Sequence, residues 1–293
     1  MIFASIDIGS NAIRLLCVHI FENDKGKLMS SQTAFVRMPV RLGEDVFTNG
    51  RITPEREKKL LKVLAAFKVL MEVDEIKAFE AVATSAMREA ENGAQIITRI
   101  EKELGIRVRI IDGQEEAEII RKAGEISVVG EFPLAMFVDV GGGSTEISVQ
   151  KNGQFVNSQS FNIGTLRLLS GKTDPEEWNR MFDWLKQFEE HFGNIECVGS
   201  GGNINKIAKV FGDRERKTIS LKQFEKAYKN LSDMSVLERM EVYGFRRDRA
   251  DVIVPAAEIY LKIMNIVKCN NILAPRIGLA DGLVINLYKQ FSK

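Results

Sequence analysis

Histidine and cysteine are scarce in this sequence, and each scarcity excludes a kind of site. The two histidines, His19 and His191, are too few to build a histidine-rich metal cluster. The cysteines are odd in number, far apart in the sequence and flanked by apolar residues: Cys17, Cys197 and Cys269. This pattern predicts buried free thiols in a reducing compartment rather than a disulfide framework or a zinc site.

Long apolar runs and an excess of one charge are also missing. No run approaches the ~20 apolar residues of a membrane-spanning helix, and Met1 leads directly into a strand-like segment rather than a signal peptide. Lys and Arg number 41 against 40 Asp and Glu, a net charge of +1 that argues against a dedicated nucleic-acid-binding protein. With 293 residues, 45% of them hydrophobic, the chain is long enough for one large or two ordinary domains. We expect a cytoplasmic globular protein with no membrane or nucleic-acid partner.

One pattern occurs twice. An apolar run ends in apolar-Asp-apolar-Gly at residues 6–9 and again at residues 138–141, and the two aspartates, Asp7 and Asp139, are 132 residues apart. In both copies a second apolar or alternating run follows, and in the later copy Asn152-Gly153 predicts a tight hairpin. We interpret the two copies as an internal duplication.

The rest of each copy supports this interpretation. Strand-like runs at 78–83 and 195–198 each lead into a loop of small residues and then into a helical pattern. The stretch from Arg249 to Val267 resembles one long apolar helix with a kink at Pro255, and Leu279 to Phe291 predicts a closing helix. Because strands and helices alternate, the expected class is a layered α/β fold.

The segment Asp139-Val-Gly-Gly-Gly-Ser-Thr-Glu146 is the strongest candidate for chemistry. Three glycines, at positions 141 to 143, leave backbone N–H groups open to an anion, and the Ser144 hydroxyl adds a donor. The carboxylates of Asp139 and Glu146 suit a hard cation such as Mg²⁺. The alternative is a glycine-rich hairpin turn with a charged flank, but a turn needs fewer glycines.

Two further loops resemble weaker versions of this one. Residues 7 to 14 supply Asp7 as a possible metal ligand and Ser10 and Asn11 as phosphate donors, although an acidic strand end of this kind is common. Gly199-Ser-Gly-Gly202-Asn precedes a helix, where backbone N–H groups form an anion site unless the loop serves only as a cap.

Charged residues elsewhere have ordinary interpretations beside functional ones. The segment Asp112-Gly-Gln-Glu-Glu116 opens a helix, where Glu115 stands at the capping-box position and leaves Glu116 to project elsewhere. By default, Arg88 is a surface cation. The short basic clusters 214–217 and 246–249 are typical of solvated faces, and the alternative is that they guide a polyanion.

Taken together, these segments resemble the exopolyphosphatase and guanosine-pentaphosphate phosphohydrolase (Ppx/GppA) family. Six motifs occur in one order along almost the whole chain: Asp7–Arg14, Val40–Glu44, Ala83–Arg88, Gly113–Ala117, Asp139–Glu146 and Gly199–Gly202. The resemblance implies two ribonuclease-H-like domains of the actin-like ATPase superfamily with a cleft between them. We place them at 1–126 and 127–278, with helix 279–293 returning to the first, and expect a short form of the family without its C-terminal helical module.

The resemblance also implies roles for residues of this sequence. Glu116 matches the glutamate that activates water, and Asp139 matches the acid that orients water or metal. The phosphate-binding positions are Ser10, Asn11, Arg14, Arg88, Gly141, Gly142, Gly143, Ser144, Gly201 and Gly202. In the family an arginine usually stands where this chain has Ala280, so no role is assigned there.

The predicted activity is hydrolysis of the terminal phosphoanhydride of inorganic polyphosphate, guanosine pentaphosphate or both. We expect Mg²⁺ or Mn²⁺ near Asp139, with Glu146 and Asp7 as further ligands, and water attack assisted by Glu116. Two alternatives are a kinase or ATPase of the same superfamily and a non-enzymatic sensor of polyphosphate or an alarmone. Without a long basic track, short substrates should be used at least as well as long chains. A homodimer could assemble such a track from its basic clusters.

Overall fold

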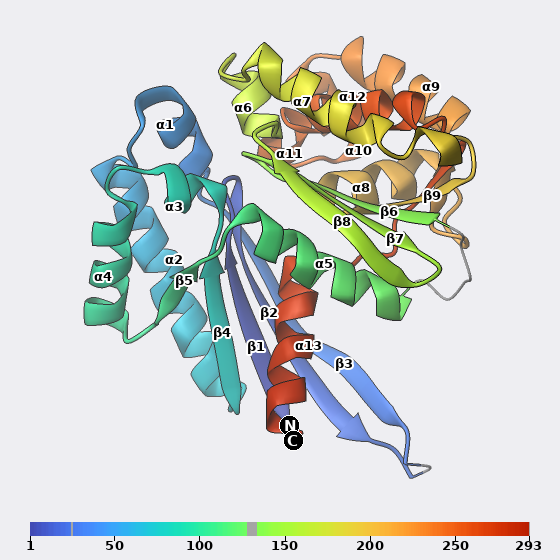
Figure 1. The fold of residues 1–293 in the computed structure, drawn as a ribbon. Helices are drawn as coiled ribbons and strands as arrows, with labels where there is room; N and C mark the ends of the chain where they lie inside the picture. Colours follow the sequence, from blue (N-terminus) through green and yellow to red (C-terminus); the bar gives the residue numbers. More distant parts are fainter. Residues whose placement is uncertain (25, 128–133, 293) are drawn as a thin grey trace. The chain divides into compact units, whose positions relative to one another are not determined.

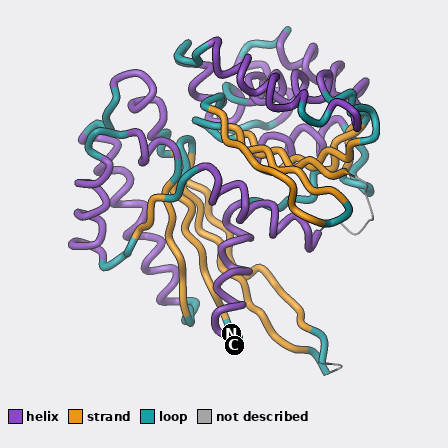
Figure 2. Tube along the Cα trace, viewed as in Figure 1, coloured by secondary structure: helices purple, strands orange, loops and turns teal. Residues whose placement is uncertain are grey.

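The structure is a computed structural model that describes residues 1–24, 26–127 and 134–292. It divides into two compact units, one formed by Met1–Asp112 with Leu279–Lys293 and the other by Gly113–Gly278. Each unit contains a β-sheet with helices packed on it (Figures 1 and 2). The sequence placed the division after residue 126. The difference is helix α5 (Gly113–Ser127), which packs on the sheet of the second unit.

The first unit has a five-stranded sheet in the order β3-β2-β1-β4-β5. β1, β2 and β3 are antiparallel neighbours, whereas β4 and β5 run parallel to β1. The strands are β1 (Ile2–Ile8), β2 (Ala12–Glu22), β3 (Leu28–Pro39), β4 (Ala78–Ala83) and β5 (Val108–Ile110). The helices are α1 (Leu42–Asn49), α2 (Pro54–Val73), α3 (Ser85–Glu89), α4 (Gly93–Leu104) and α13 (Leu279–Phe291).

Helix α13 joins the first unit although it ends the chain. Its buried residues Ala280, Val284 and Leu287 pack on Phe3 and on side chains of β2. The Ser5 hydroxyl donates to the Ala280 carbonyl at 2.8 Å. Position 280 is 5% exposed, so the small side chain fits the packing of α13 on the sheet, and a longer side chain there would have to be accommodated.

The second unit has a six-stranded sheet in the order β10-β11-β9-β6-β7-β8. Its strands are β6 (Leu134–Val140), β7 (Thr145–Lys151), β8 (Gln154–Phe161), β9 (Ile195–Ser200), β10 (Thr218–Ser220) and β11 (Asn271–Leu273). Besides α5, its helices are α6 (Thr165–Leu169), α7 (Pro175–Lys186), α8 (Gly202–Phe211), α9 (Leu221–Ser232), α10 (Val236–Tyr243), α11 (Arg247–Ala250) and α12 (Ile253–Ile266). A 3-10 turn covers Glu189–His191.

Alternation along β6 decides which face of this sheet carries polar groups. Met136 and Val138 point into the main hydrophobic core. Ala135 and Phe137 point to the opposite face, where a side chain at position 124 of α5 would collide with the Phe137 ring. Because successive strand residues alternate, Asp139 lies on the α5 face.

The two units repeat one topology. Strands β8-β7-β6-β9-β11 of the second sheet match β3-β2-β1-β4-β5 of the first in order and direction. The turns after β1 and β6 close with equivalent bonds, Gly9 N–H to the Ala12 carbonyl and Gly141 N–H to the Ser144 carbonyl. The duplication and the expected α/β class with two ribonuclease-H-like units are confirmed.

One expected helix is two helices. Instead of a single kinked helix from Arg249 to Val267, α11 ends at Ala250 and α12 begins at Ile253. Pro255 stands in the first turn of α12, where a backbone N–H has no intrahelical partner, so it starts a helix rather than bending one.

All three cysteines are buried free thiols, as expected. Burial raises the pKa of Cys17 to about 11, so this thiol stays protonated at neutral pH. Among the described residues, no helix is both long and apolar enough to span a membrane.

Candidate active site in the second unit

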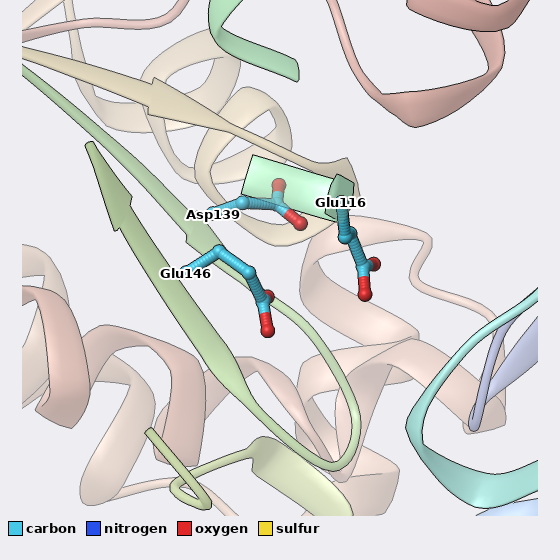
Figure 3. Close-up of side chains that lie close together, drawn as sticks. All are labelled: Glu116, Asp139 and Glu146. Atoms are coloured by element: carbon cyan, nitrogen blue, oxygen red, sulfur yellow. The ribbon is translucent and has the colours of Figure 1, made fainter. Parts of the chain in front are cut away.

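Three carboxylates from three elements meet in the second unit (Figure 3). Glu116 comes from the first turn of α5, Asp139 from the end of β6 and Glu146 from the start of β7. One oxygen from each lies within 4.8 Å of the others. Glu116 and Glu146 are buried, at 8% and 2% exposure, although carboxylates at such positions are costly unless paired or bound to a cation.

The strand register sets two of these carboxylates in a row of four polar residues. Asp139 pairs with Glu146 on β7 and with Ser200 on β9, and Glu146 pairs with Ser160 on β8. The Ser160 hydroxyl donates to Glu146 Oε1 at 2.8 Å, and the Ser200 hydroxyl donates to Asp139. A neutral donor at each end therefore orients both carboxylates.

A buried tyrosine holds the strands beneath this row together. The Tyr260 hydroxyl, from α12, lies 2.8 Å from the Ser200 carbonyl and 3.1 Å from the Val138 carbonyl. Burial, and after it the charge of Asp139, raises the pKa of Tyr260 well above its ordinary value. The phenol remains a protonated donor, which fixes β6 against β9.

Helix α5 approaches the row closely because it begins with glycine. A Cβ at Gly113 would lie 2.3 Å from Cβ and Oγ of Ser160, closer than any real contact. Three residues later, Glu116 reaches Asp139 and Glu146, and the Ser148 hydroxyl contacts the Ala117 carbonyl at 3.5 Å. Without a side chain at position 113, the first turn of α5 lies directly on β8.

The glycine loop between β6 and β7 is held from behind by α6. The Gly141 carbonyl accepts from Thr165 N–H, the Gly142 carbonyl from Leu166 N–H, and the Gly143 carbonyl from the Arg167 side chain. Within the described part of the chain, the backbone N–H groups of Gly142, Gly143 and Ser144 donate no hydrogen bond to protein. The carbonyls of this loop are therefore bonded to α6, whereas its N–H groups are available to a bound anion. Such an arrangement is typical of anion-binding loops.

The second small-residue loop, between β9 and α8, touches the same cluster. Gly201 has φ of +90°, which a side chain would strain, and its Cβ would lie 3.0 Å from Asp139 Oδ1. Gly202 begins α8, and its carbonyl accepts from Arg249. Gly201 therefore allows the loop to pass close to Asp139.

The candidate residues of the first unit have partners within that unit. Asp7 is ion-paired with Arg14, its cross-strand neighbour. Ser10 is buried, with its hydroxyl 2.8 Å from that of Ser85 and accepting from Ala86 N–H, so this side chain holds the start of α3. Arg88 donates to the Ile111 carbonyl at 2.7 Å. Asn11, half-buried, lies beside Ser10 in the β1–β2 turn, and its carbonyl accepts from Arg41 N–H.

Some residues of the site were anticipated from the sequence, and others were not. The carboxylate cluster contains Glu116 and does not include Glu115, the neighbour with which it was most easily confused. Ser160 and the hydroxyl of Ser200 were missed as partners of the carboxylates. No motif marks them, because their role depends on the strand register.

The carboxylate cluster suits a hard divalent cation. Three carboxylate oxygens, joined by no histidine or thiol of the described residues, are ligands that Mg²⁺ and Mn²⁺ accept and that Zn²⁺ sites seldom use alone. Asp139 and Glu146 would hold the ion, because their serine partners already fix them.

Two duplicated α/β units, with a carboxylate cluster beside glycine loops, define the class as a phosphoryl-processing protein of ribonuclease-H-like architecture. Residues 20–291 match the model of the Ppx/GppA phosphatase family. The chain belongs to this family and is a phosphoanhydride hydrolase.

Individual relatives agree with this assignment. Exopolyphosphatase 1 of Mycobacterium tuberculosis is 25% identical over 96% of this chain and 86% of its own length. A guanosine-5'-triphosphate,3'-diphosphate pyrophosphatase of Aliivibrio fischeri is 23% identical over 96% of this chain but 58% of its own. The crystal structure of the Aquifex aeolicus Ppx/GppA family member is 29% identical, covers 99% of this chain and 98% of its own, and superposes with a TM-score of 0.77.

Proposed function

We propose that the protein releases the terminal phosphate of inorganic polyphosphate, guanosine pentaphosphate or both, by attack of water in the presence of Mg²⁺ or Mn²⁺. The observation that carries the proposal is the meeting of Glu116, Asp139 and Glu146 beside two glycine loops. The named activities of the relatives support the choice of substrates.

Asp139 and Glu146 are the proposed metal ligands. Each keeps one oxygen bonded to a serine hydroxyl, so the carboxylate is oriented before any ion arrives. A divalent cation held by these two residues would neutralise charge on the phosphate oxygens of the substrate. Asp7 remains a candidate ligand by resemblance alone.

Glu116 is the proposed general base. It lies in the first turn of α5, and its buried carboxylate reaches the cluster formed with Asp139 and Glu146. A carboxylate at this position takes a proton from water as the oxygen attacks the terminal phosphorus. The proton stays on Glu116 until the product leaves.

The glycine loops are the proposed phosphate contacts. The N–H groups of Gly142, Gly143 and Ser144 point away from α6, and donors fixed in this way stabilise charge that develops on the transferred phosphoryl group. Gly201 and Gly202 supply the second loop. In the first unit, Ser10, Asn11, Arg14 and Arg88 remain candidates by resemblance.

A phosphate-release assay on polyphosphate and on guanosine pentaphosphate, with ATP as a third substrate, tests the proposal. We expect release from one or both of the first two and none of comparable rate from ATP. Preferred turnover of ATP, or phosphate transfer to an added acceptor, would replace the hydrolase with an ATPase or a kinase.

A further inference from the structure

The glycine loop between β6 and β7 has little local preference that would orient its peptide groups. Three successive glycines, at positions 141 to 143, can adopt backbone conformations that are closed to other residues. A hydrogen-bond donor stabilises developing charge best when its direction is fixed before the reaction. The N–H groups of this loop therefore need a restraint from outside the loop.

Helix α6 restrains the loop through its carbonyl groups. In a planar trans peptide, the carbonyl and the N–H of the next residue point in opposite directions. Thr165 N–H donates to the Gly141 carbonyl at 3.0 Å, which turns the N–H of Gly142 away from the helix. Leu166 N–H donates to the Gly142 carbonyl at 2.8 Å, and the N–H of the next glycine is turned in the same way. Two peptide groups of the loop are therefore fixed by backbone donors.

The third peptide group is fixed by a side chain. Arg167 Nε donates to the Gly143 carbonyl at 2.8 Å. By the same planarity, this bond turns the Ser144 N–H to the side of the loop opposite α6. A backbone N–H is present with any residue but proline in the helix, whereas a guanidinium is present only because the sequence has Arg167. The direction of the Ser144 N–H therefore depends on the identity of one side chain.

The first turn of α6 lies close enough to the loop for this bond because the helix begins after a glycine. A Cβ at Gly164 would lie 2.4 Å from the carbonyl carbon of Gly143 and 2.5 Å from that of Gly142. Gly164 has φ of −144°, an extended conformation open to other residues, so the position requires space rather than an unusual backbone. Arg167 N–H also donates to the Gly142 carbonyl, at 3.2 Å. Arg167 is thus held on the loop by its backbone as well as by its side chain.

The first unit holds the equivalent carbonyl with a backbone group. Asn11 stands in the β1–β2 turn where Gly143 stands in the second unit, and its carbonyl accepts from Arg41 N–H at 2.9 Å. The same restraint therefore occurs in both copies of the duplicated turn. Only in the second copy, where the carboxylate cluster lies, is it made by a charged side chain.

We propose that Arg167 is a positioning residue of the candidate active site. It fixes the peptide group between Gly143 and Ser144, so that the Ser144 N–H faces the phosphoryl group being transferred. The inference rests on the proposed function for what the loop binds. Arg167 acts through the loop and not on the substrate, and its loss should therefore affect one donor and leave the other loop donors in place.

The direct test follows the loop by NMR of the whole protein with isotope-labelled glycine and serine. Arg167→Met removes the donor and keeps an unbranched side chain. In the free protein, this substitution should shift the carbonyl resonance of Gly143, because the carbonyl loses its hydrogen bond. When inorganic phosphate and Mg²⁺ are added, the N–H resonance of Ser144 should lose most of its response, whereas that of Gly142 should keep it.

Arg214→Met is the matched control, because Arg214 Nε also donates to a backbone carbonyl of the second unit, that of Lys209 at 3.0 Å. It should leave the loop resonances as they are in the unsubstituted protein. An unchanged Ser144 response in Arg167→Met, or an equal loss in the control, overturns the role of Arg167 and leaves the proposed function standing. Loss of the Gly142 response as well would show that the whole loop had moved, and would overturn the assignment to one peptide group.

The opposite failure is also recognisable. If Arg167→Met shifts the Gly143 carbonyl resonance but the loop of the unsubstituted protein does not respond to phosphate, Arg167 still fixes the peptide group. The proposed function of the loop is then wrong.

Steady-state kinetics add a measurement that a purely structural role would not change. In Arg167→Met, kcat should fall about 10²-fold, the low end of the cost of losing one such donor. KM should change less than about threefold, because the donor acts mainly in the transition state. Arg167→Lys, which keeps a charged donor, should recover part of kcat. Unchanged kcat in Arg167→Met, or no recovery in Arg167→Lys, would contradict the proposal.

Discussion

At the scale of single residues, substitutions of Glu116 and Glu115 should have very different effects on the rate of hydrolysis. Glu116→Gln keeps the shape of the side chain and removes the base, so the hydrolysis rate should fall roughly 10²–10⁴-fold. Glu115→Gln should cost far less, because this residue is outside the cluster. Steady-state rates of both variants, with substrate binding measured in chelator, decide the assignment. The reverse order of effects would move the base to Glu115.

The Ser160 hydroxyl is predicted to tune metal affinity without touching substrate. Ser160→Ala removes the donor that orients Glu146, and loss of such a partner typically weakens metal binding about 10–100-fold. Titration with Mn²⁺ gives the apparent dissociation constant. Ser158→Ala, two residues along the same strand, is the control and should leave the affinity within about twofold, a small change on the scale of one hydrogen bond. Equal affinities in both variants would contradict the role of Ser160.

At the scale of elements, the position of α5 depends on one glycine. Gly113→Ala places a Cβ 2.3 Å from Ser160, so the helix must move off β8. Overpacking of this kind costs about 1–3 kcal/mol of unfolding free energy, and activity should fall as Glu116 moves with the helix. Denaturant unfolding measures the first effect and phosphate release the second.

Gly278→Ala is the control, since a Cβ there meets no atom within 4 Å. Adding Ser160→Gly to Gly113→Ala should restore part of the lost stability, because the two residues collide directly. If the double variant is no more stable than Gly113→Ala, the close approach of α5 is not what that glycine provides.

The duplication of the two units extends to a short helix and the turn that it contacts. In each unit a short helix after the third strand bonds to the turn after the first: Gly43 N–H of α1 to the Ser10 carbonyl, and Leu166 N–H of α6 to the Gly142 carbonyl. The copies then diverge in the partner of the aspartate. Asp7 faces Arg14, with which it forms an ion pair, whereas Asp139 faces Glu146, a second carboxylate. The residue opposite the aspartate therefore decides whether it meets a cation from its own chain or a second carboxylate that favours a bound metal ion.

At the scale of the whole molecule, activity and stability should both depend on a divalent cation. Phosphate release should vanish in chelator and return with Mg²⁺ or Mn²⁺. Binding to the folded state alone adds about 2.7 kcal/mol when the ion is at 100 times its Kd, so thermal unfolding should shift upward with added ion. The shift should shrink in Ser160→Ala. Full activity in chelator would remove the metal from the proposal.

The preference for short or long substrates is also a property of the whole molecule. The sequence showed only short basic clusters, and we expected short substrates to be used at least as well as long chains. The fold brings Arg246 and Arg249 together with Lys206, Lys209 and Arg276 in one pocket of the second unit. Initial rates on tripolyphosphate and on long polyphosphate test the expectation about substrate length.

The sequence by itself determined the α/β class, the duplication and the carboxylates of Asp139 and Glu146, because each depends on local pattern. Alternation placed Asp139 at a strand end and turn residues marked the hairpins, whereas Glu116 was singled out by the resemblance to the family. The compact units differ from the sequence division only by α5, because a helix between two domains has no local sign of which sheet it will cover.

The tertiary structure alone decided the partners of these residues. From the Asn152-Gly153 turn, simple register would set Glu146 opposite Gln159, but a bulge between Val149 and Gln150 moves it opposite Ser160. The basic pocket likewise joins residues up to 74 positions apart (from 202 to 276). The packing of the core decides which segments, and therefore which surface charges, lie side by side. The hydrophobic pattern of the sequence does not indicate these neighbours.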